Sequence, residues 1–321
     1  MAAALAACAF IAACGGDDDD AEQAPPPAAK AEDFPKADGK TLAELRASLP
    51  PGGPVLAPSV SQLTTGDNRL GFGLFSRSRE QIQDAPVAVY VAPAGGGEAR
   101  GPFPARWESL EVSPEYQSRQ TATDPLAAKS LYVSDIPFDQ PGRYELLGMA
   151  QLDDRLVAAT SAIGAMPVVE ESKDSIPNAG DRAPDIHTET EADVGGDLAS
   201  IDTRIPPSSM HNADFADVVG KKPVVLLFAT PALCQSLVCG PVVDIAEELK
   251  AELGDDDVEF IHQEVFKDNE IAKGLRPQLD AFNLRTEPWV FTFDGDGRVA
   301  ARLEGAYSAK ELREAIDAAR G

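Results

Sequence analysis

The pattern of hydrophobic and polar positions changes character along the chain. From about residue 55 to 170, short β-type runs alternate with turn signals, and no helical segment intervenes. Alternation is visible from Val87 to Val91, and Asp153-Asp154 separates two runs as a hairpin turn does. Strands are predicted over 69–75, 85–92, 129–134, 144–152 and 155–163. Such a succession of strands predicts an all-β sandwich.

After residue 215 the pattern becomes mixed. Residues 224–229 form a continuous apolar run, typical of a central strand covered on both faces. Strands are also predicted over 258–265, 289–293 and 298–304, and helices over 215–219, 244–253 and 269–282, the last interrupted by Pro277. Ser308 and Glu311 form a capping box that begins a final helix. The order βαβαββα predicts an α/β domain.

The first fourteen residues predict a lipid anchor. Residues 1–13 are apolar, and Ile11-Ala12-Ala13-Cys14 resembles the cleavage site of bacterial lipoproteins, in which the cysteine is lipidated. Cys8 fits the same pattern but lies too early to leave an adequate apolar segment before it. A membrane-spanning helix is not predicted, because it needs about 18 or more apolar residues. Residues 15–50, rich in Asp, Pro and Ala, are interpreted as a disordered tether carrying a short helix over 41–49.

The charge excludes one class of partner. The chain has 53 acidic and 28 basic residues, a formal net charge of −25. Such a surface repels phosphate backbones, so we expect no nucleic-acid partner. It also repels anionic lipid, which leaves the lipid anchor as the expected membrane attachment.

The candidate chemistry lies in residues 223–241, PVVLLFATPALCQSLVCGP. An apolar strand there leads into two cysteines, Cys234 and Cys239, at the expected start of a helix. With Cys8 removed and Cys14 lipidated, these are the two thiols of the mature chain, and a pair in an extracytoplasmic compartment is either a disulfide or a redox couple. In a regular helix the two positions lie about 140° apart. Cys234 must therefore precede the helix if the two are to pair.

These parts resemble the thioredoxin superfamily. Gly180-Asp181-Arg182-Ala183-Pro184-Asp185 is similar to the entry of its peroxiredoxin and membrane-anchored thioredoxin branch. The resemblance implies that Glu287-Pro288 is a cis bond facing the cysteines, where a substrate backbone pairs beside it. It also implies that Cys234 is the nucleophile and Cys239 the resolving thiol, with no cofactor. A helix N-terminus lowers a thiol pKa, which favours attack by Cys234. The family has two residues between its cysteines, whereas this chain has four.

Alternatives to redox catalysis remain open at this point. One is a binding or scaffold protein with a structural disulfide. Another is a copper-binding protein of the same fold, for which His262 and His211, beside Met210, are the candidate ligands. A peroxidase is a third, although Thr230 and Pro231 lack the required spacing to Cys234.

The sequence therefore predicts two domains: an all-β immunoglobulin-like sandwich over 51–172 and an α/β thioredoxin-like fold over 173–321. Asp139–Tyr144 resembles the tyrosine corner of immunoglobulin-like domains. No His or Cys lies between residues 15 and 186, so the first domain is interpreted as structural. We expect an extracytoplasmic thiol-disulfide oxidoreductase, lipid-anchored on the outer face of the cytoplasmic membrane. Its expected partners are protein thiols or disulfides of the cell envelope.

Overall fold

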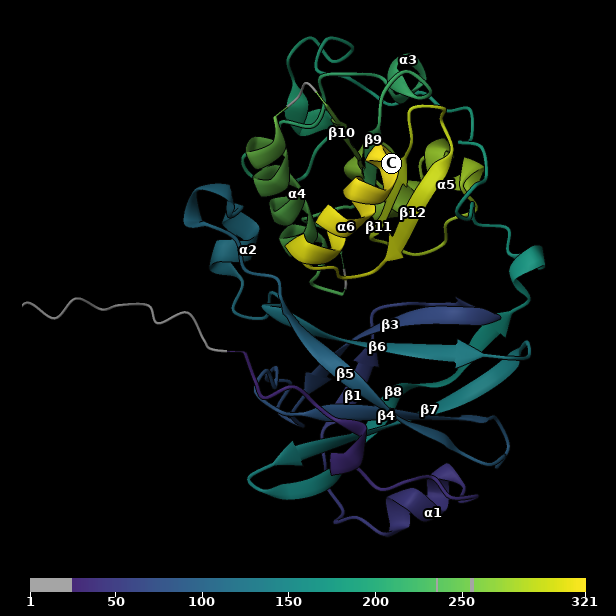
Figure 1. Cartoon of the computed structure of the whole chain (residues 1–321). Helices are drawn as coiled ribbons and strands as arrows, with labels where there is room; N and C mark the ends of the chain where they lie inside the picture. The colour runs from purple at the N-terminus through teal and green to yellow at the C-terminus, as the bar shows by residue number, and fades with distance from the viewer. Residues whose placement is uncertain (1–24, 235, 255–256) are drawn as a thin grey trace, which may run out of the picture.

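The computed structural model describes residues 25–234, 236–254 and 257–321, and the predicted anchor at Cys14 lies outside them. Figure 1 shows two layers of structure: a β-domain, and above it an α/β domain formed by the C-terminal part of the chain. The β-domain contains an eight-stranded sheet and the α/β domain a four-stranded sheet.

The β-domain has more strands than predicted. They are β1 (Val55–Pro58), β2 (Leu63–Thr64), β3 (Gly66–Phe75), β4 (Val87–Pro93), β5 (Arg100–Ser109), β6 (Ser130–Phe138), β7 (Gly142–Leu152) and β8 (Arg155–Val169). The five predicted strands are confirmed as β3, β4, β6, β7 and β8, whereas β1, β2 and β5 were missed. Pro102 and Pro104 lie within β5, and proline argues against a strand interior when only the sequence is read.

The β-domain sheet closes on itself. Its order is β1-β3-β6-β5-β4-β7-β8-β2, and β1 also pairs with β8, which gives a ring of seven strands with β2 attached to β8. The all-β prediction is confirmed, but the sandwich of two separate sheets is not, because the β4–β5 hairpin makes the hydrogen-bonded ladder continuous. The tyrosine corner is present: the Tyr144 hydroxyl donates to the Gln140 carbonyl at 3.0 Å.

The predicted tether is partly wrong. A short 3-10 turn, Ala31–Asp33, is followed by α1 (Leu42–Ala47), which confirms the predicted short helix. Thr41 is its N-cap. Phe34 and Leu45 are buried against the barrel in a cluster with Tyr90, Leu147, Met149 and other apolar residues. The Tyr90 hydroxyl donates to the Pro35 carbonyl at 2.5 Å. Few apolar residues thus suffice to anchor this segment, because the barrel supplies the other half of the core.

The second domain has thioredoxin-like topology. Its strands are β9 (Val224–Phe228), β10 (Glu259–Gln263), β11 (Trp289–Phe293) and β12 (Val299–Glu304). They lie in the order β10-β9-β11-β12. β10 is parallel to β9, and β11 is antiparallel to both β9 and β12. The predicted order of elements is therefore confirmed.

The helices flank this sheet. They are α3 (Phe215–Val218), α4 (Cys239–Leu253), α5 (Pro277–Ala281) and α6 (Ala309–Arg320), which begins with the predicted capping box. The long helix predicted over 269–282 is wrong. Asp268, Asn269 and Gly274 adopt positive φ angles of 51°, 54° and 75°, so only short 3-10 turns precede α5. Helical backbone has negative φ, and these three residues therefore interrupt it.

One hydrophobic cluster joins the two domains. Leu110, Leu131 and Val133 of the β-domain pack with residues of β9, α4 and α6 in a single buried core. At its edge the buried Glu311 of α6 accepts two hydrogen bonds of 2.7 Å from Arg69 and one of 2.8 Å from Arg106. Burial alone would raise the pKa of the Glu311 carboxyl. Arg69 and Arg106 outweigh this effect, and the pKa lies below its usual value.

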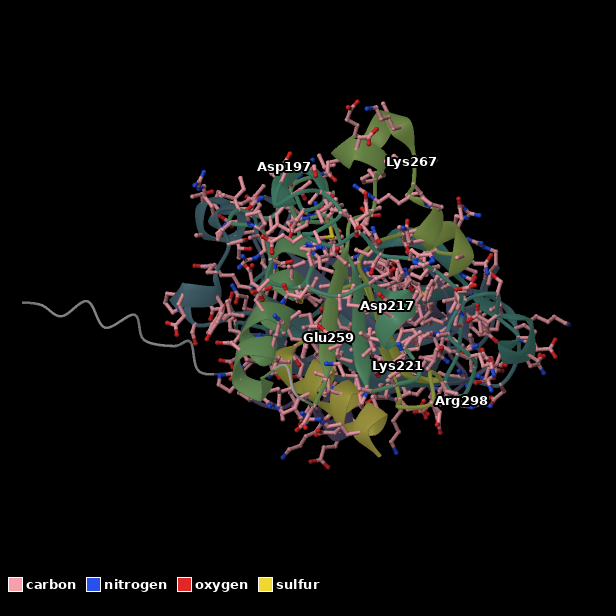
Figure 2. The ribbon with its side chains drawn as sticks, turned by 90° about the horizontal axis from the view of Figure 1, so that it is seen from above. Asp197, Asp217, Lys221, Glu259, Lys267 and Arg298 are labelled. Atoms are coloured by element: carbon pink, nitrogen blue, oxygen red, sulfur yellow. A yellow bond between two sulfur atoms is a disulfide. The ribbon has the colours of Figure 1, made fainter. Side chains whose placement is uncertain are left out.

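The negative charge is not confined to one patch. Figure 2 shows acidic residues such as Asp197 and Asp217 on the same face as Lys221 and Arg298. Lys221 donates from its ammonium group to the Asp217 carbonyl at 2.5 Å. Within the described residues, no helix is long and apolar enough to cross a membrane.

The N-terminal segment gives the first testable prediction. Leu45 is 1% exposed, and its replacement by alanine should lower the free energy of unfolding by about 2–5 kcal/mol. The matched control is Arg46→Ala, an exposed residue of the same helix, which should change it by less than about 0.5 kcal/mol. Urea denaturation measures both. Equal, negligible effects would show that the segment is a tether.

Candidate functional site

The candidate site is the loop between β9 and α4. After β9 ends, the Thr230 carbonyl accepts hydrogen bonds from the amides of Leu233, at 3.2 Å, and Cys234, at 3.1 Å. This turn leaves Cys234 before the helix, while Cys239 is the first residue of α4. The two cysteines form a disulfide with a Cα–Cα distance of 6.0 Å. This distance lies within the usual range for a disulfide. The predicted placement of Cys234 before the helix and Cys239 at its start is confirmed.

The two sulfur-bearing residues differ in accessibility. Cys239 is fully buried in the core that joins the domains. Cys234 is partly exposed, and its Sγ lies 3.1 Å from the hydroxyl of Ser236. Thiol–disulfide exchange requires access to the attacked sulfur. Cys234 is therefore the more accessible of the two cysteines to an external thiol.

The loop contains one unusual backbone position. Leu237 lies between the cysteines with a φ of 60°, and its side chain is exposed. A bulky residue seldom adopts this left-handed conformation, and such positions cluster at functional sites. The Leu237 carbonyl accepts a hydrogen bond from the Ala128 amide of the β-domain at 3.3 Å. A contact from the other domain therefore helps to hold the loop in this form.

Pro288 lies at the same end of the sheet as the cysteine loop. The Glu287-Pro288 bond is cis, as predicted. Trp289 pairs with Phe228, the last residue of β9, so Pro288 precedes β11 where β9 leads into the cysteine loop. The Pro288 ring is buried, whereas Glu287 is half-buried, and burial raises the pKa of the Glu287 carboxyl. The role of Pro288 in substrate docking stays a prediction.

The β-domain lies against this end of the thioredoxin-like domain. This contact between the domains was not predicted. The connection from β5 to β6 carries α2 (Arg119–Thr123), which lies beside α4 (Figure 1). The Ser118 amide donates to the buried Asp244 carboxylate of α4 at 3.0 Å. Arg204 pairs with the other oxygen of Asp244 at 2.9 Å. On the opposite side, the Ser61 amide donates to Glu304 at 2.8 Å, close to Pro288 in the β-ladder.

Gly240 permits this contact. A Cβ at Gly240, the residue after Cys239, would lie 2.7 Å from the Thr121 hydroxyl oxygen. Real Cβ atoms essentially never come that close to another atom. The glycine therefore allows α2 to pack directly on the first turn of α4.

Both candidate histidines are brought together, but with an aspartate that sequence reasoning missed. His211 Nε2 lies 3.0 Å and His262 Nδ1 3.3 Å from Oδ2 of Asp202, and all three residues are buried. Burial lowers the pKa of His262, but the Asp202 charge outweighs it and raises the pKa to about 9. Burial raises the pKa of Asp202, and the charge of His262 holds that pKa well below its usual value. The copper hypothesis named these two histidines as ligands, and the structure directs both rings at Asp202.

No protein-family model matches the chain, and no curated protein matches it. A solved structure from Chlorobium tepidum, described as a thiol:disulfide interchange protein DsbE, aligns with 45% of this chain and 99% of its own. Its sequence identity is 17% and the TM-score 0.33. A protein described as belonging to the thioredoxin-like superfamily aligns with 35% of this chain and 87% of its own, at 17% identity and a TM-score of 0.28. At these scores the fold assignment rests on the strand order of the domain itself.

The contact at Gly240 gives the second prediction. Alanine stabilises an unconstrained helix by about 0.5–1 kcal/mol relative to glycine. Gly240→Ala should instead destabilise the protein by about 1–3 kcal/mol, because the new Cβ overpacks against Thr121. Thr121→Ala removes the hydroxyl, so Gly240→Ala in that background should be neutral or stabilising. Thermal denaturation of the four proteins in this double-mutant cycle measures the coupling. Additive effects would contradict the packing of α2 on α4.

Proposed function

We propose that this protein is a thiol-disulfide oxidoreductase that acts through Cys234 and Cys239. The observation that carries the proposal is the asymmetric disulfide on a thioredoxin-like domain: one partly exposed cysteine before the helix and one buried cysteine at the helix start. The N-terminus of a 15-residue helix favours negative charge, which stabilises a thiolate formed there. No side chain caps this helix start.

Oxidation of a substrate begins with the disulfide form. A substrate thiolate attacks Sγ of Cys234, forming a mixed disulfide, and the electron pair of the broken bond leaves with Cys239 as a thiolate. A second thiolate of the substrate then attacks the substrate sulfur that is bonded to Cys234. The substrate leaves as a disulfide, and Cys234 leaves as a thiolate, so the protein gains the two electrons that the substrate loses. Reduction of a substrate disulfide follows the same steps in reverse.

The proposed substrates are protein thiols or disulfides of the cell envelope. The exposed side chains of Leu237 and Ala232 flank the accessible sulfur and offer apolar contact to an extended peptide. The resemblance to thioredoxins adds Pro288 as the position beside which a substrate backbone pairs. Because the β-domain packs against this end of the fold, a substrate can approach the disulfide only from the side on which Cys234 lies. We propose no cofactor for this exchange and no nucleic-acid partner.

A scaffold protein with a structural disulfide is the competing function. It is favoured by the burial of Cys239 and by the hydrogen bond from Ala128 to the cysteine loop. In that case the β-domain would permanently shield the disulfide. The two functions differ in whether the reduced, folded protein offers a reactive thiolate at Cys234.

We further propose that the β-domain is a distant relative of immunoglobulin-like domains. The segments β1-β3-β6-β5 and β4-β7-β8 match the two sheets of that fold, here joined through the β4–β5 pairing. The tyrosine corner at Tyr144 supports the same relationship. In this proposal the domain is a non-catalytic module that fixes the orientation of the redox domain.

The reactivity of the two thiols tests the proposed function. In the reduced, folded protein near neutral pH, iodoacetamide should label Cys234 at least about tenfold faster than Cys239, because only Cys234 is accessible and proposed to be a thiolate. Peptide mass spectrometry measures the two rates. Unfolding in urea is the control, since both thiols should then react at similar rates. Equal, slow labelling in the folded protein would favour the scaffold.

Trapping tests the proposed order of attack. Cys239→Ser should accumulate a mixed disulfide between Cys234 and a disulfide-containing substrate peptide, because the resolving thiol is absent. Cys234→Ser should trap little, since Cys239 is buried. Non-reducing gels followed by mass spectrometry quantify the adducts. Equal trapping by both variants would contradict the assigned roles.

The membrane anchor is a separate proposal that rests on the sequence. Cys14→Ser should shift the protein from the membrane fraction to a soluble fraction, because no lipid can be attached. The matched control is Cys8→Ser, which leaves the proposed lipidation site intact and should stay with the membrane. Fractionation and intact-mass measurement of the processed N-terminus distinguish the outcomes. Retention of Cys14→Ser on the membrane would exclude this anchor.

A further inference from the structure

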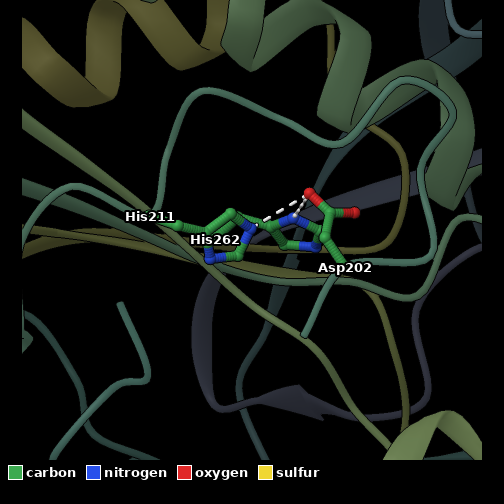
Figure 3. Close-up of side chains that lie close together, drawn as sticks. All are labelled: Asp202, His211 and His262. Carbon is green, nitrogen blue, oxygen red and sulfur yellow. Dashed lines mark hydrogen bonds and ion pairs between the residues drawn. The ribbon is translucent and has the colours of Figure 1, made fainter. Parts of the chain in front are cut away.

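Three buried side chains, Asp202, His211 and His262, converge at one edge of the thioredoxin-like sheet (Figure 3). His262 lies on β10, and the other two come from the connection that precedes α3. The Met210 carbonyl accepts a hydrogen bond from the His262 amide at 3.0 Å, so this connection runs along the outer edge of β10. The cluster plays no part in the disulfide exchange proposed above.

The two histidine rings are directed at the same carboxylate oxygen. Figure 3 shows both rings facing Oδ2 of Asp202. This oxygen also accepts the Ser208 amide at 2.6 Å, so three potential donors converge on it. An oxygen of a carboxylate has about two lone-pair sites. A purely hydrogen-bonded network is therefore overcrowded at Oδ2.

A hydrogen bond to its second nitrogen fixes the ring of His262 as ligands are fixed in metal sites. His262 Nε2 faces the Ala229 carbonyl at 3.1 Å, which assigns a proton to Nε2. A histidine that binds a metal ion commonly donates its other N–H to a backbone carbonyl. The ring of His211 is 3% exposed, and its Nδ1 is buried without a hydrogen-bond partner. The polar network of these described residues is thus not fully satisfied, whereas buried polar groups normally are.

The spacing suits a small divalent cation. Ligand atoms on a tetrahedral zinc ion, bound at about 2.0–2.1 Å, are about 3.3 Å apart. The two Asp202 contacts, 3.0 and 3.3 Å, are close to this value. All three ligand atoms lie within 4.8 Å of one another, and zinc binding requires the two histidine nitrogens to lie within about 4.2 Å. The hydroxyl of Ser208 lies 3.2 Å from His262 Nδ1 and offers a further oxygen beside the cluster. Two imidazoles and one carboxylate are donors that Zn²⁺ accepts.

We propose that Asp202, His211 and His262 form a buried structural site for a divalent cation of the Zn²⁺ class. The ion replaces the protons between the rings and Oδ2, and it ties β10 to the 202–211 connection. Thr203, next to Asp202, accepts a hydrogen bond from the Ala232 amide at 3.1 Å, two residues before Cys234. The ion therefore braces the support of the cysteine loop without touching the sulfurs.

The test uses the mature full-length protein with its cysteines oxidised, so that thiolates do not compete for metal. After chelator treatment, the protein is incubated with ZnCl₂ and desalted, and bound zinc is counted by mass spectrometry. We expect about one ion per chain. With CoCl₂, we expect the visible absorption of tetrahedral Co²⁺ without a thiolate charge-transfer band. No retained zinc in the folded, oxidised protein would overturn the proposal.

Matched histidine variants locate the ion. His211→Gln keeps a polar side chain beside Asp202 but removes an imidazole ligand, and zinc affinity should fall at least about 100-fold. The control is His187→Gln, because His187 is exposed and pairs with Asp214 outside the cluster. It should bind zinc like the wild type. Equal binding by His211→Gln, or binding that appears only after reduction and is lost in Cys234→Ser, would place the metal elsewhere and overturn the proposal.

A measurement without any variant covers the case in which His211→Gln fails to fold. Anomalous diffraction at the zinc edge from wild-type crystals locates the ion directly. A peak between the two histidine rings and Asp202 supports the site. A zinc peak only at other residues, or none in zinc-soaked crystals, contradicts it.

Discussion

A hydrophobic cluster shared by the two domains holds them together. Leu110, Leu131 and Val133 of the barrel pack with β9, α4 and α6, and Cys239 is part of the same core. Burial of apolar surface is the dominant favourable term in folding and is roughly proportional to area. The cluster therefore fixes the position of α4, and with it the end of the sheet at which the disulfide lies. The ion pairs of Glu311 with Arg69 and Arg106 orient the two domains, but they contribute less to stability than the apolar contacts do.

The two sulfurs differ in environment. The shared core buries Cys239, while the turn after Thr230 leaves Cys234 partly exposed, so the disulfide has one accessible and one buried sulfur. The proposed cation site lies behind the same loop, connected through Thr203 and Ala232. The β-domain and the histidine cluster thus both support the cysteine loop. Gly240 and Leu237 contact the β5–β6 connection of the β-domain.

Much of the fold could be predicted from local patterns. The apolar run of β9 and the capping box at Ser308 are local signals, and each was confirmed. The cis bond before Pro288 was expected only from the resemblance to thioredoxins. The failures have non-local causes. Phe34 and Leu45 are buried because the barrel completes their core, and β5 forms despite its prolines because neighbouring strands hold it. Asp202 could not be assigned to the histidines, because Asp is common in this acidic chain and only the folded connection brings it to β10.

We propose that the Cys234–Cys239 disulfide is a working redox couple within the folded protein. The most direct measurement equilibrates the wild type in thiol buffers of defined potential and counts free thiols by mass after maleimide labelling. A working couple should show a reversible two-electron transition between about −120 and −270 mV, with circular dichroism unchanged across it. A disulfide that resists reduction until below about −300 mV, or that is reduced only as the protein unfolds, would contradict it.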